Sequence, residues 1–240
     1  MTERYHAGGY WPGRKESAEA CARRAETFFR HLSRCDPLFS RWFEQAESLE
    51  EGLRLQFEPV YQSFVRLFGK EENQLDGDGI IFGAWTGHDE GHGSGVSLIC
   101  GSSSPPPPNN CRLSLPEQQP HAERVLTVPV LEEVLRALAL AWEPDWAAVF
   151  SNEFRAAMSE TGKWGTFVGW VTYVSCRRGE VPPLPEPVRV EPVGDKGTLI
   201  ILTPERLSAF NPEHLTLGRR VQKVLDEKDL LRPVLTAAAR

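Results

Sequence analysis

The sequence predicts an α+β fold in which one mixed or mainly antiparallel sheet is flanked by helices. Two amphipathic helical patterns, over residues 18–35 and 130–141, lie among a group of short extended segments, and a third helical pattern follows near the end of the chain. Strands that cluster between flanking helices, rather than alternating with them, favour α+β over α/β. Apolar residues make up 40% and charged residues 25%, as in globular proteins. We expect a single domain over residues 1–240.

The first helix has the clearest periodic signal in the chain. Ser17 is a residue type that caps helices, and apolar residues then recur at spacings of three and four along the predicted helix. Asp36-Pro37 ends the pattern, because proline disfavours helical backbone in the residue before it. On either side of this helix, residues 5–14 are expected to form a short strand or an irregular arm, and residues 39–46 a short strand or a turn.

Two shorter helices are expected next. Ser48 and Glu51 have the spacing of a capping box, in which each side chain bonds to the backbone N–H of the other residue. Glu58-Pro59 can begin the second helix, since proline is tolerated at the first helical position, and Gly69 ends its apolar stripe.

A series of strands is expected after these helices. Extended segments are predicted over residues 80–85, 95–100 and 111–115. A loop rich in glycine, histidine and acids, residues 86–94, joins the first two. Residues 101–110 contain four consecutive prolines, which lack the backbone N–H that a sheet requires. We therefore expect an exposed Pro-rich loop at 101–110.

The second half of the chain contains both helical and extended patterns. The helix over 130–141 ends before Pro144, and the β-branched and aromatic residues 167–175 predict a strand. Asn211-Pro212 pairs a capping residue with a proline suited to the start of the last helix. The other expected elements are a strand over 146–150, a helix over 152–158, a proline-rich linker over 181–187 and a hairpin over 188–202.

Composition excludes several classes of protein. A net charge of −6 argues against general nucleic-acid binding, which needs a basic face. No apolar run approaches the roughly 20 residues that span a membrane, and the N-terminus lacks the apolar region of a secretory signal. The five cysteines are an odd number without a CxxC pair, so we expect reduced thiols in a cytoplasmic protein.

No motif of nucleophilic, phosphate-binding or zinc chemistry occurs, so we expect no enzyme, no cofactor and no metal. Two alternatives stay open. A metal-dependent enzyme could use the loop that holds His88, Asp89, Glu90 and His92, although no helix fixes the two imidazoles on one face. A small-ligand-binding domain would instead show an apolar pocket lined by some of the seven tryptophans.

Negative charge is concentrated in one part of the sequence. Residues 44–90 contain 11 acids and 3 bases, a charge of −8, whereas the rest of the chain has 22 acids and 24 bases, a charge of +2. Such a segment is either a solvated face or a surface that attracts a basic partner. On the second interpretation, the residues expected to contact the partner are Asp76, Asp78, Trp85, Asp89 and Glu90. Trp85 enters as an aromatic anchor and the acids as charges free of structural roles.

Three groups of residues, in this order along the chain, carry a resemblance to a known family. They are Gly9-Tyr10-Trp11-Pro12-Gly13-Arg14 with Glu16-Ser17-Ala18; Trp164-Gly165 with Gly169-Trp170-Val171-Thr172-Tyr173; and Val188-Arg189-Val190-Glu191, Gly197-Thr198-Leu199-Ile200, Thr203-Pro204-Glu205-Arg206 and Asn211-Pro212-Glu213-His214. With these motifs the chain resembles the immunity protein 52 family of bacterial polymorphic toxin systems. The prolines at 105–108 look like an addition to the family pattern.

The resemblance implies a cytoplasmic antidote encoded by a gene adjacent to that of a secreted toxin. Toxins associated with this family have the restriction-endonuclease fold, and some are delivered by type VI secretion. The protein would bind its cognate nuclease toxin and silence it. An acidic face complements the basic cleft in which a nuclease holds its substrate, so the charge pattern agrees with this expectation. The resemblance assigns no residue a contact with the toxin.

Overall fold

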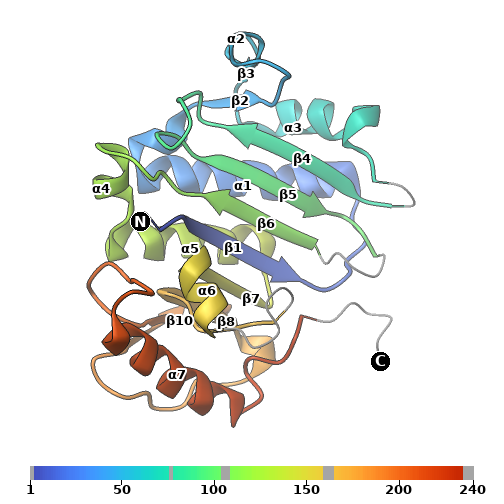
Figure 1. Cartoon of the computed structure of the whole chain (residues 1–240). Helices are drawn as coiled ribbons and strands as arrows, with labels where there is room; N and C mark the ends of the chain where they lie inside the picture. The colour runs from blue at the N-terminus through green and yellow to red at the C-terminus, as the bar shows by residue number, and fades with distance from the viewer. Residues whose placement is uncertain (1–2, 76–77, 104–108, 159–164, 235–240) are drawn as a thin grey trace.

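A ten-stranded antiparallel sheet runs through the molecule in a computed structural model that describes residues 3–75, 78–103, 109–158 and 165–234 (Figure 1). The strand order is β3-β2-β4-β5-β6-β1-β7-β8-β10-β9. The strands are β1 (Tyr5–Trp11), β2 (Trp42–Glu44), β3 (Gln56–Phe57), β4 (Ile80–Trp85), β5 (Gly95–Cys100), β6 (Asn109–Ser114), β7 (Trp146–Ser151), β8 (Val171–Ser175), β9 (Arg189–Val193) and β10 (Gly197–Ile201). The predicted α+β fold with a mainly antiparallel sheet is confirmed.

Helices lie on both faces of this sheet but cover them unequally. They are α1 (Ala18–Cys35), α2 (Leu49–Gly52), α3 (Tyr61–Phe68), α4 (His121–Val125), α5 (Val128–Trp142), α6 (Asn152–Met158) and α7 (Pro212–Asp226). On one face α1 packs between α3 and α5, and α5 contacts the central strands. On the other face α6 contacts β7 and α7 packs on α6 (Figure 1). No helix within the described ranges is long and apolar enough to cross a membrane.

The first strand of the chain lies in the middle of the sheet. β1 pairs with β6 on one side and with β7 on the other. Its alternate residues Ala7 and Trp11 are buried beneath α5, where Trp11 stacks on Trp142 with ring centroids 5.3 Å apart. The segment expected to be a short strand or an arm is therefore a central strand that joins the two halves of the sheet.

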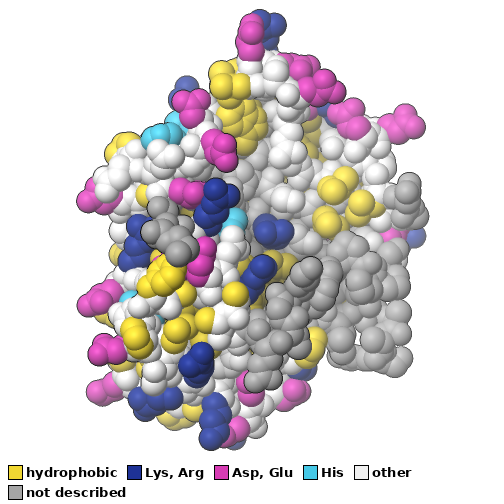
Figure 2. Space-filling view, viewed as in Figure 1, with side chains coloured by type: hydrophobic (Ala, Val, Ile, Leu, Met, Phe, Trp, Pro, Cys, Tyr) yellow, Lys and Arg dark blue, Asp and Glu magenta, His cyan; other side chains and the backbone are white. Residues whose placement is uncertain are grey.

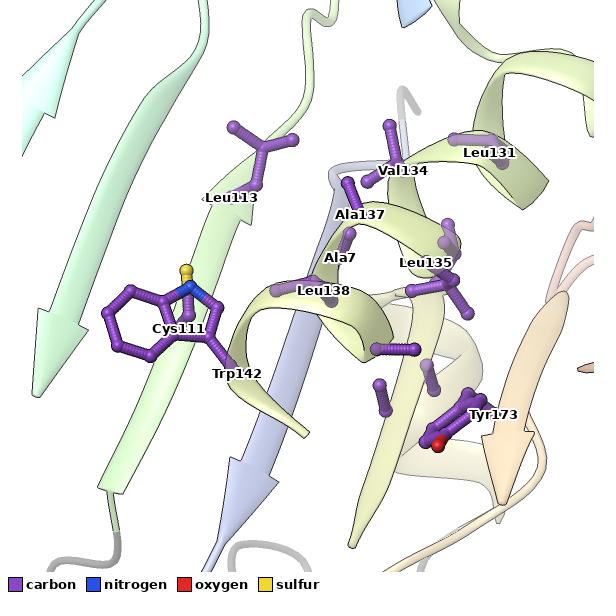
Figure 3. Packing of buried hydrophobic residues seen from close by; sticks show 14 of the residues in the cluster. Ala7, Cys111, Leu113, Leu131, Val134, Leu135, Ala137, Leu138, Trp142 and Tyr173 are labelled. Atoms are coloured by element: carbon purple, nitrogen blue, oxygen red, sulfur yellow. The ribbon is translucent and has the colours of Figure 1, made fainter. Parts of the chain in front are cut away.

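The apolar stripe predicted for α5 packs on the strands as expected (Figure 3). Leu131, Val134, Leu135 and Leu138 are all fully buried. On the strands, Ala7 of β1, Cys111 and Leu113 of β6, and Tyr173 of β8 lie against this helix (Figure 3). Burying each such side chain contributes about 1.5–3 kcal/mol of hydrophobic stabilisation, so α5 fixes the centre of the sheet.

Helix α1 begins after Ser17, whose Oγ accepts a hydrogen bond from the backbone N–H of Ala20. It ends at Asp36, as the proline predicted. Residues 39–46 divide into a short 3₁₀ turn and strand β2. Helix α3 begins two residues after Pro59, and α4 and β3 were not expected, because elements this short leave little periodicity in a sequence.

Two expected boundaries are wrong. Residues 109 and 110 belong to β6 rather than to a loop over 101–110, and Asn109 pairs with Trp11 of β1. The Asn109 side chain closes this connection by donating to the carbonyl oxygen of Ser102 at 2.9 Å; residues 104–108 lie outside the described part. Only the second half of 167–175 is a strand. Before it, the N–H of Gly169 donates to Thr172 Oγ1 at 2.9 Å, which turns the chain.

Candidate protein-binding face

One face of the sheet carries no described helix from β5 to β1, and at β4 the helix α2 reaches its border. Along these strands buried residues, which face α1, α3 and α5, alternate with more exposed ones. The outward residues are His6, Gly8 and Tyr10 of β1, Ile81, Gly83 and Trp85 of β4, Gly95, Ser97 and Ile99 of β5, and Asn110, Arg112 and Ser114 of β6. We call these twelve residues the open face. Figure 2 shows the molecule from the same side as Figure 1, with this face toward the viewer.

Trp85 lies at the border of the open face, where α2 meets the sheet. Its indole Nε1 donates to the carbonyl oxygen of Glu44 at 3.1 Å, and its ring lies 5.8 Å from that of Phe43. A Cβ added to Gly52 would lie 3.1 Å from the indole, so α2 rests directly on this side chain. The predicted anchor is half-buried, and it also holds α2 against the edge of the sheet.

The structure does not bring the predicted acidic residues together. Asp78 precedes β4, whereas Asp89 and Glu90 lie in the loop after it, so that a strand of roughly 17 Å separates them. Asp89 and Glu90 are exposed. Asp76 lies outside the described residues.

The expectation that these acids have no structural role is wrong for Asp78. Its carboxylate accepts hydrogen bonds from Ser102 Oγ at 2.9 Å and from the backbone N–H of Ser103 at 3.0 Å. It therefore fastens the start of β4 to the connection that follows β5.

The rest of the acidic segment lies around α2 and β3. Glu44 pairs with Lys70 at 2.5 Å and with Arg66 at 3.5 Å, so part of its charge is neutralised within the fold. Leu49 on α2 is 52% exposed, and acidic residues flank it in the sequence. Figure 2 shows acidic side chains along the upper border of this view.

The histidine-rich loop packs against α4. The rings of His88 and His121 meet edge to face with centroids 4.9 Å apart, and His121 Nδ1 lies 2.7 Å from the carbonyl oxygen of His92. Burial and the neighbouring His121 lower the pKa of His88. Within the described residues no group of three histidine, cysteine or acidic side chains could hold a metal ion. The loop thus has a packing role, and nothing in its geometry favours the metal-dependent alternative.

Basic side chains, which the sequence did not single out, gather around the open face. Burial, together with the charges of three arginines, lowers the pKa of His6 to about 4. They are, in decreasing order of effect, Arg112, Arg155 and Arg4. They come from β6, α6 and the start of the chain, so no sequence window contains them all.

A pocket of about 550 Å³ lies beside α7, far along the sheet from α2. Its lining is mixed: prolines and Leu217 lie beside charged and polar side chains such as Glu213, His214 and Arg220. None of the seven tryptophans lines it. It therefore differs from the tryptophan-lined site that was expected of a small-ligand-binding domain.

Comparison with known proteins places the chain in a family. The family model of immunity protein 52 matches residues 3–234. This chain belongs to the immunity protein 52 family. Among solved structures it is similar to the Pseudomonas aeruginosa T6SS protein PA0821, with 11% identity, a TM-score of 0.54, and coverage of 92% of this chain and 72% of that chain. No curated protein sequence matches. At this identity the structural likeness shows the fold alone.

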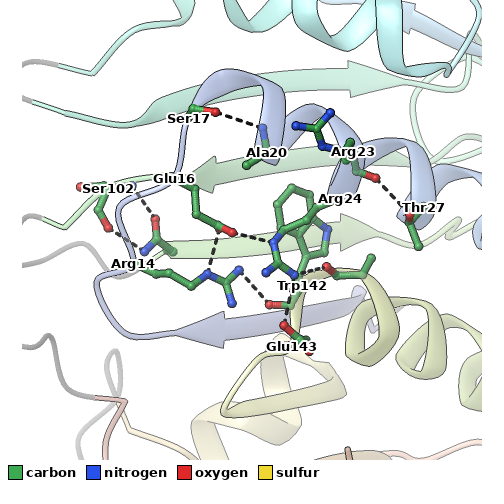
Figure 4. Close-up of polar contacts among 12 residues, drawn as sticks. Arg14, Glu16, Ser17, Ala20, Arg23, Arg24, Thr27, Ser102, Trp142 and Glu143 are labelled. Atoms are coloured by element: carbon green, nitrogen blue, oxygen red, sulfur yellow. Dashed lines mark hydrogen bonds and ion pairs between the residues drawn. The ribbon is translucent and has the colours of Figure 1, made fainter.

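The first motif of the immunity protein 52 resemblance stabilises the end of α5 (Figure 4). Arg14 donates to the carbonyl oxygen of Trp142 at 3.1 Å, and Arg24 donates to that of Ala141 at 2.9 Å. Glu16 pairs with both arginines at 2.8 Å. The last carbonyls of a helix lack intrahelical partners, so this motif satisfies groups that would otherwise be unpaired.

The later immunity protein 52 motifs also serve the fold. Trp170 Nε1 donates to the carbonyl oxygen of Thr203 at 3.0 Å, which joins the second motif to the third. Gly197 lies so close to the carbonyl oxygen of Val174 that no Cβ fits. Asn211 caps α7 by accepting from the N–H of Glu213 at 2.9 Å. None of these later motif residues belongs to the open face.

Proposed function

We propose that this chain is the cytoplasmic immunity protein of a nuclease-type toxin, which it binds and neutralises. Membership of the immunity protein 52 family over residues 3–234 is the observation that carries the proposal. The toxin would have the restriction-endonuclease fold, would be encoded by an adjacent gene and would be a candidate for type VI delivery. The protein acts by forming a complex, and it turns over no substrate.

The acidic border of the open face supports this choice of partner. Asp89 and Glu90 are exposed beyond the end of β4, close to the half-buried Trp85. A nuclease presents a basic cleft to the phosphates of its substrate, and a border of opposite charge would steer the two proteins together. Leu49 and the indole would add apolar contact at the same border.

The test is a binding titration against the product of the neighbouring gene, at two salt concentrations. A double variant, Asp89→Lys with Glu90→Lys, should slow association and reduce its salt dependence, because exposed charges act mainly on the rate of encounter. Asp78 is left unchanged because it holds the fold together. The matched control is Glu180→Lys with Glu205→Lys, two exposed acids elsewhere. Absence of any binding by the wild-type protein would refute the proposed function.

A further inference from the structure

An arginine lies at the centre of the open face, and its neighbours on the adjacent strands are small residues. In the register of the sheet, Arg112 of β6 lies between Ser97 of β5 and Gly8 of β1. Gly83 of β4 follows Ser97 in the same row, and the side chain of Gln45 lies over this glycine. Arg112 is exposed, and among the described residues it makes no ion pair or hydrogen bond. Its guanidinium is thus accessible, with all its donors available to a ligand.

Two further arginines extend this positive charge. Arg155 of α6 lies over the ring of Phe150 at 5.7 Å, and Phe150 pairs with His6 in the sheet. Arg4 pairs with Glu117 at 3.3 Å, so one of the three positive charges is neutralised. No described carboxylate pairs with either of the other two. Both depress the pKa of His6, as expected of a local positive potential.

An apolar strip lies next to the arginine. Ile81 of β4 is directly opposite Ile99 of β5, one row away from Arg112, and Ile81 is 40% exposed. Across β6 the row passes through the polar Asn110 and then reaches Tyr10, whose ring stacks on Trp146 at 5.5 Å. The positive charge of Arg112 therefore lies beside a pair of isoleucines on β4 and β5, on a face four strands or about 14 Å wide.

We infer that the open face is the docking site for a segment of the toxin that carries a carboxylate, which Arg112 binds while a neighbouring apolar side chain rests on Ile81 and Ile99. This inference rests on the proposed function and names the surface that performs it. A guanidinium can bind a carboxylate through two parallel hydrogen bonds, and its charge complements the segment. The open face measures about 14 by 17 Å, and this area is smaller than the roughly 800 Å² of surface that each partner contributes to a stable complex. The border with Trp85 would supply further contact.

The surroundings favour an acidic protein segment over a nucleic acid. The chain has a net charge of −6, and acids lie around α2 and along the border of the open face. A polyphosphate chain that extended past Arg112 would meet these acids, whereas a single carboxylate flanked by apolar or basic side chains would not. The isoleucines beside the arginine also suit an amino-acid side chain.

A peptide titration tests the surface without the toxin. A hexapeptide with one glutamate between leucines, added to isotopically labelled protein, should shift the NMR signals of the Arg112 side chain, His6 and Ser97, whereas the same peptide with glutamine in place of glutamate should not. Arg112→Glu should abolish these shifts. Ser97→Glu should do so as well, because it places a carboxylate directly opposite Arg112 and leaves the arginine in place. Stronger binding of a thymidine hexanucleotide than of the glutamate peptide would overturn the inference, and so would shifts confined to other surfaces.

A second titration uses the toxin and separates the two proposals. Arg112→Glu and Ser97→Glu should each weaken binding at least tenfold. Arg30→Glu, the same charge reversal at an exposed position of α1 on the opposite face, should change binding less than twofold. If all three variants bind as tightly as wild type, the toxin partnership stands and the open face is not its docking site. If the wild-type protein does not bind, the proposed function itself fails.

Discussion

At the scale of single residues, the protonation of His6 on the open face affects the stability of the fold. Its folded-state pKa of about 4 is below the ordinary value of 6.5, because burial and three arginines disfavour the imidazolium. The unfolded chain therefore takes up a proton first as the pH falls. This contribution to the free energy of unfolding is complete above pH 6.5 and is lost between pH 6.5 and pH 4.

His6→Asn should make stability less dependent on pH in that window. We expect wild type to lose on the order of 2 kcal/mol more than the variant between pH 7 and pH 4.5, measured by urea denaturation. Carboxylates such as Glu3, whose pKa is lowered because hydrogen bonds outweigh its burial, lose their contribution at lower pH and affect both proteins alike. Equal losses in the two proteins would show that His6 is not held neutral.

Trp85 should contribute to stability as well as to binding. Trp85→Ala removes the support on which Gly52 and Phe43 rest, so it should lower the free energy of unfolding by about 2 kcal/mol. Trp85→Phe keeps a ring at this site and loses the bond to Glu44, and it should recover most of that stability. Thermal melts of both variants measure the effect. If Trp85→Ala melted like wild type, the contact with α2 would be unimportant.

At the scale of elements, an ion pair joins the end of α1 to α4. Asp36 is buried, and its carboxylate receives two bonds from Arg124, at 2.5 and 2.8 Å, and one from the N–H of Leu38 at 2.8 Å. Burial raises the pKa of Asp36, but these bonds together lower it by more, so the net shift is downward. The sequence indicated only the end of α1, because the partner lies 88 residues away.

A double-mutant cycle should measure a coupling of more than about 1 kcal/mol between Asp36 and Arg124, because both oxygens of a buried carboxylate are engaged. The pair Glu50 and Arg54 is the internal control. Their side chains are 81% and 74% exposed, so their coupling should be about 0.3 kcal/mol. Chemical denaturation of the single and double alanine variants gives both values. Equal couplings would mean that burial of Asp36 does not strengthen its pair.

At the scale of the whole molecule, the longer elements were predictable and the site was largely not. Helices α1, α5 and α7 follow from capping residues and apolar periodicity, which are local signals. The open face depends on which strands are neighbours, and the pairing of β1 with both β6 and β7 is not local. Three residues that the sequence indicated lie exposed or half-buried at one border of the open face: Trp85, Asp89 and Glu90. Arg112, Arg155 and His6 were missed because only the folded sheet brings them together.

Burial in the core should determine how fast the five cysteine thiols react. None of the five forms a disulfide in the structure. Cys176 is exposed and should react rapidly with a thiol reagent in the native protein. Cys100 and Cys111 are buried, which raises their pKa values and disfavours the reactive thiolate. Cys21 is also buried, and burial raises the pKa of the half-buried Cys35 to about 12. Spectrophotometric titration should find one fast thiol natively and five in denaturant; two or more fast native thiols would contradict this packing.

Inhibition of the toxin tests the central claim most directly. Nuclease activity of the product of the neighbouring gene is measured on DNA while this protein is added in increasing amounts. The proposed function predicts that activity falls to background at one equivalent. Docking on the open face predicts in addition that Arg30→Glu inhibits equally well while Arg112→Glu requires at least tenfold more protein. Full nuclease activity in the presence of a large excess of the folded wild-type protein would contradict the claim that this chain is the immunity protein of that toxin.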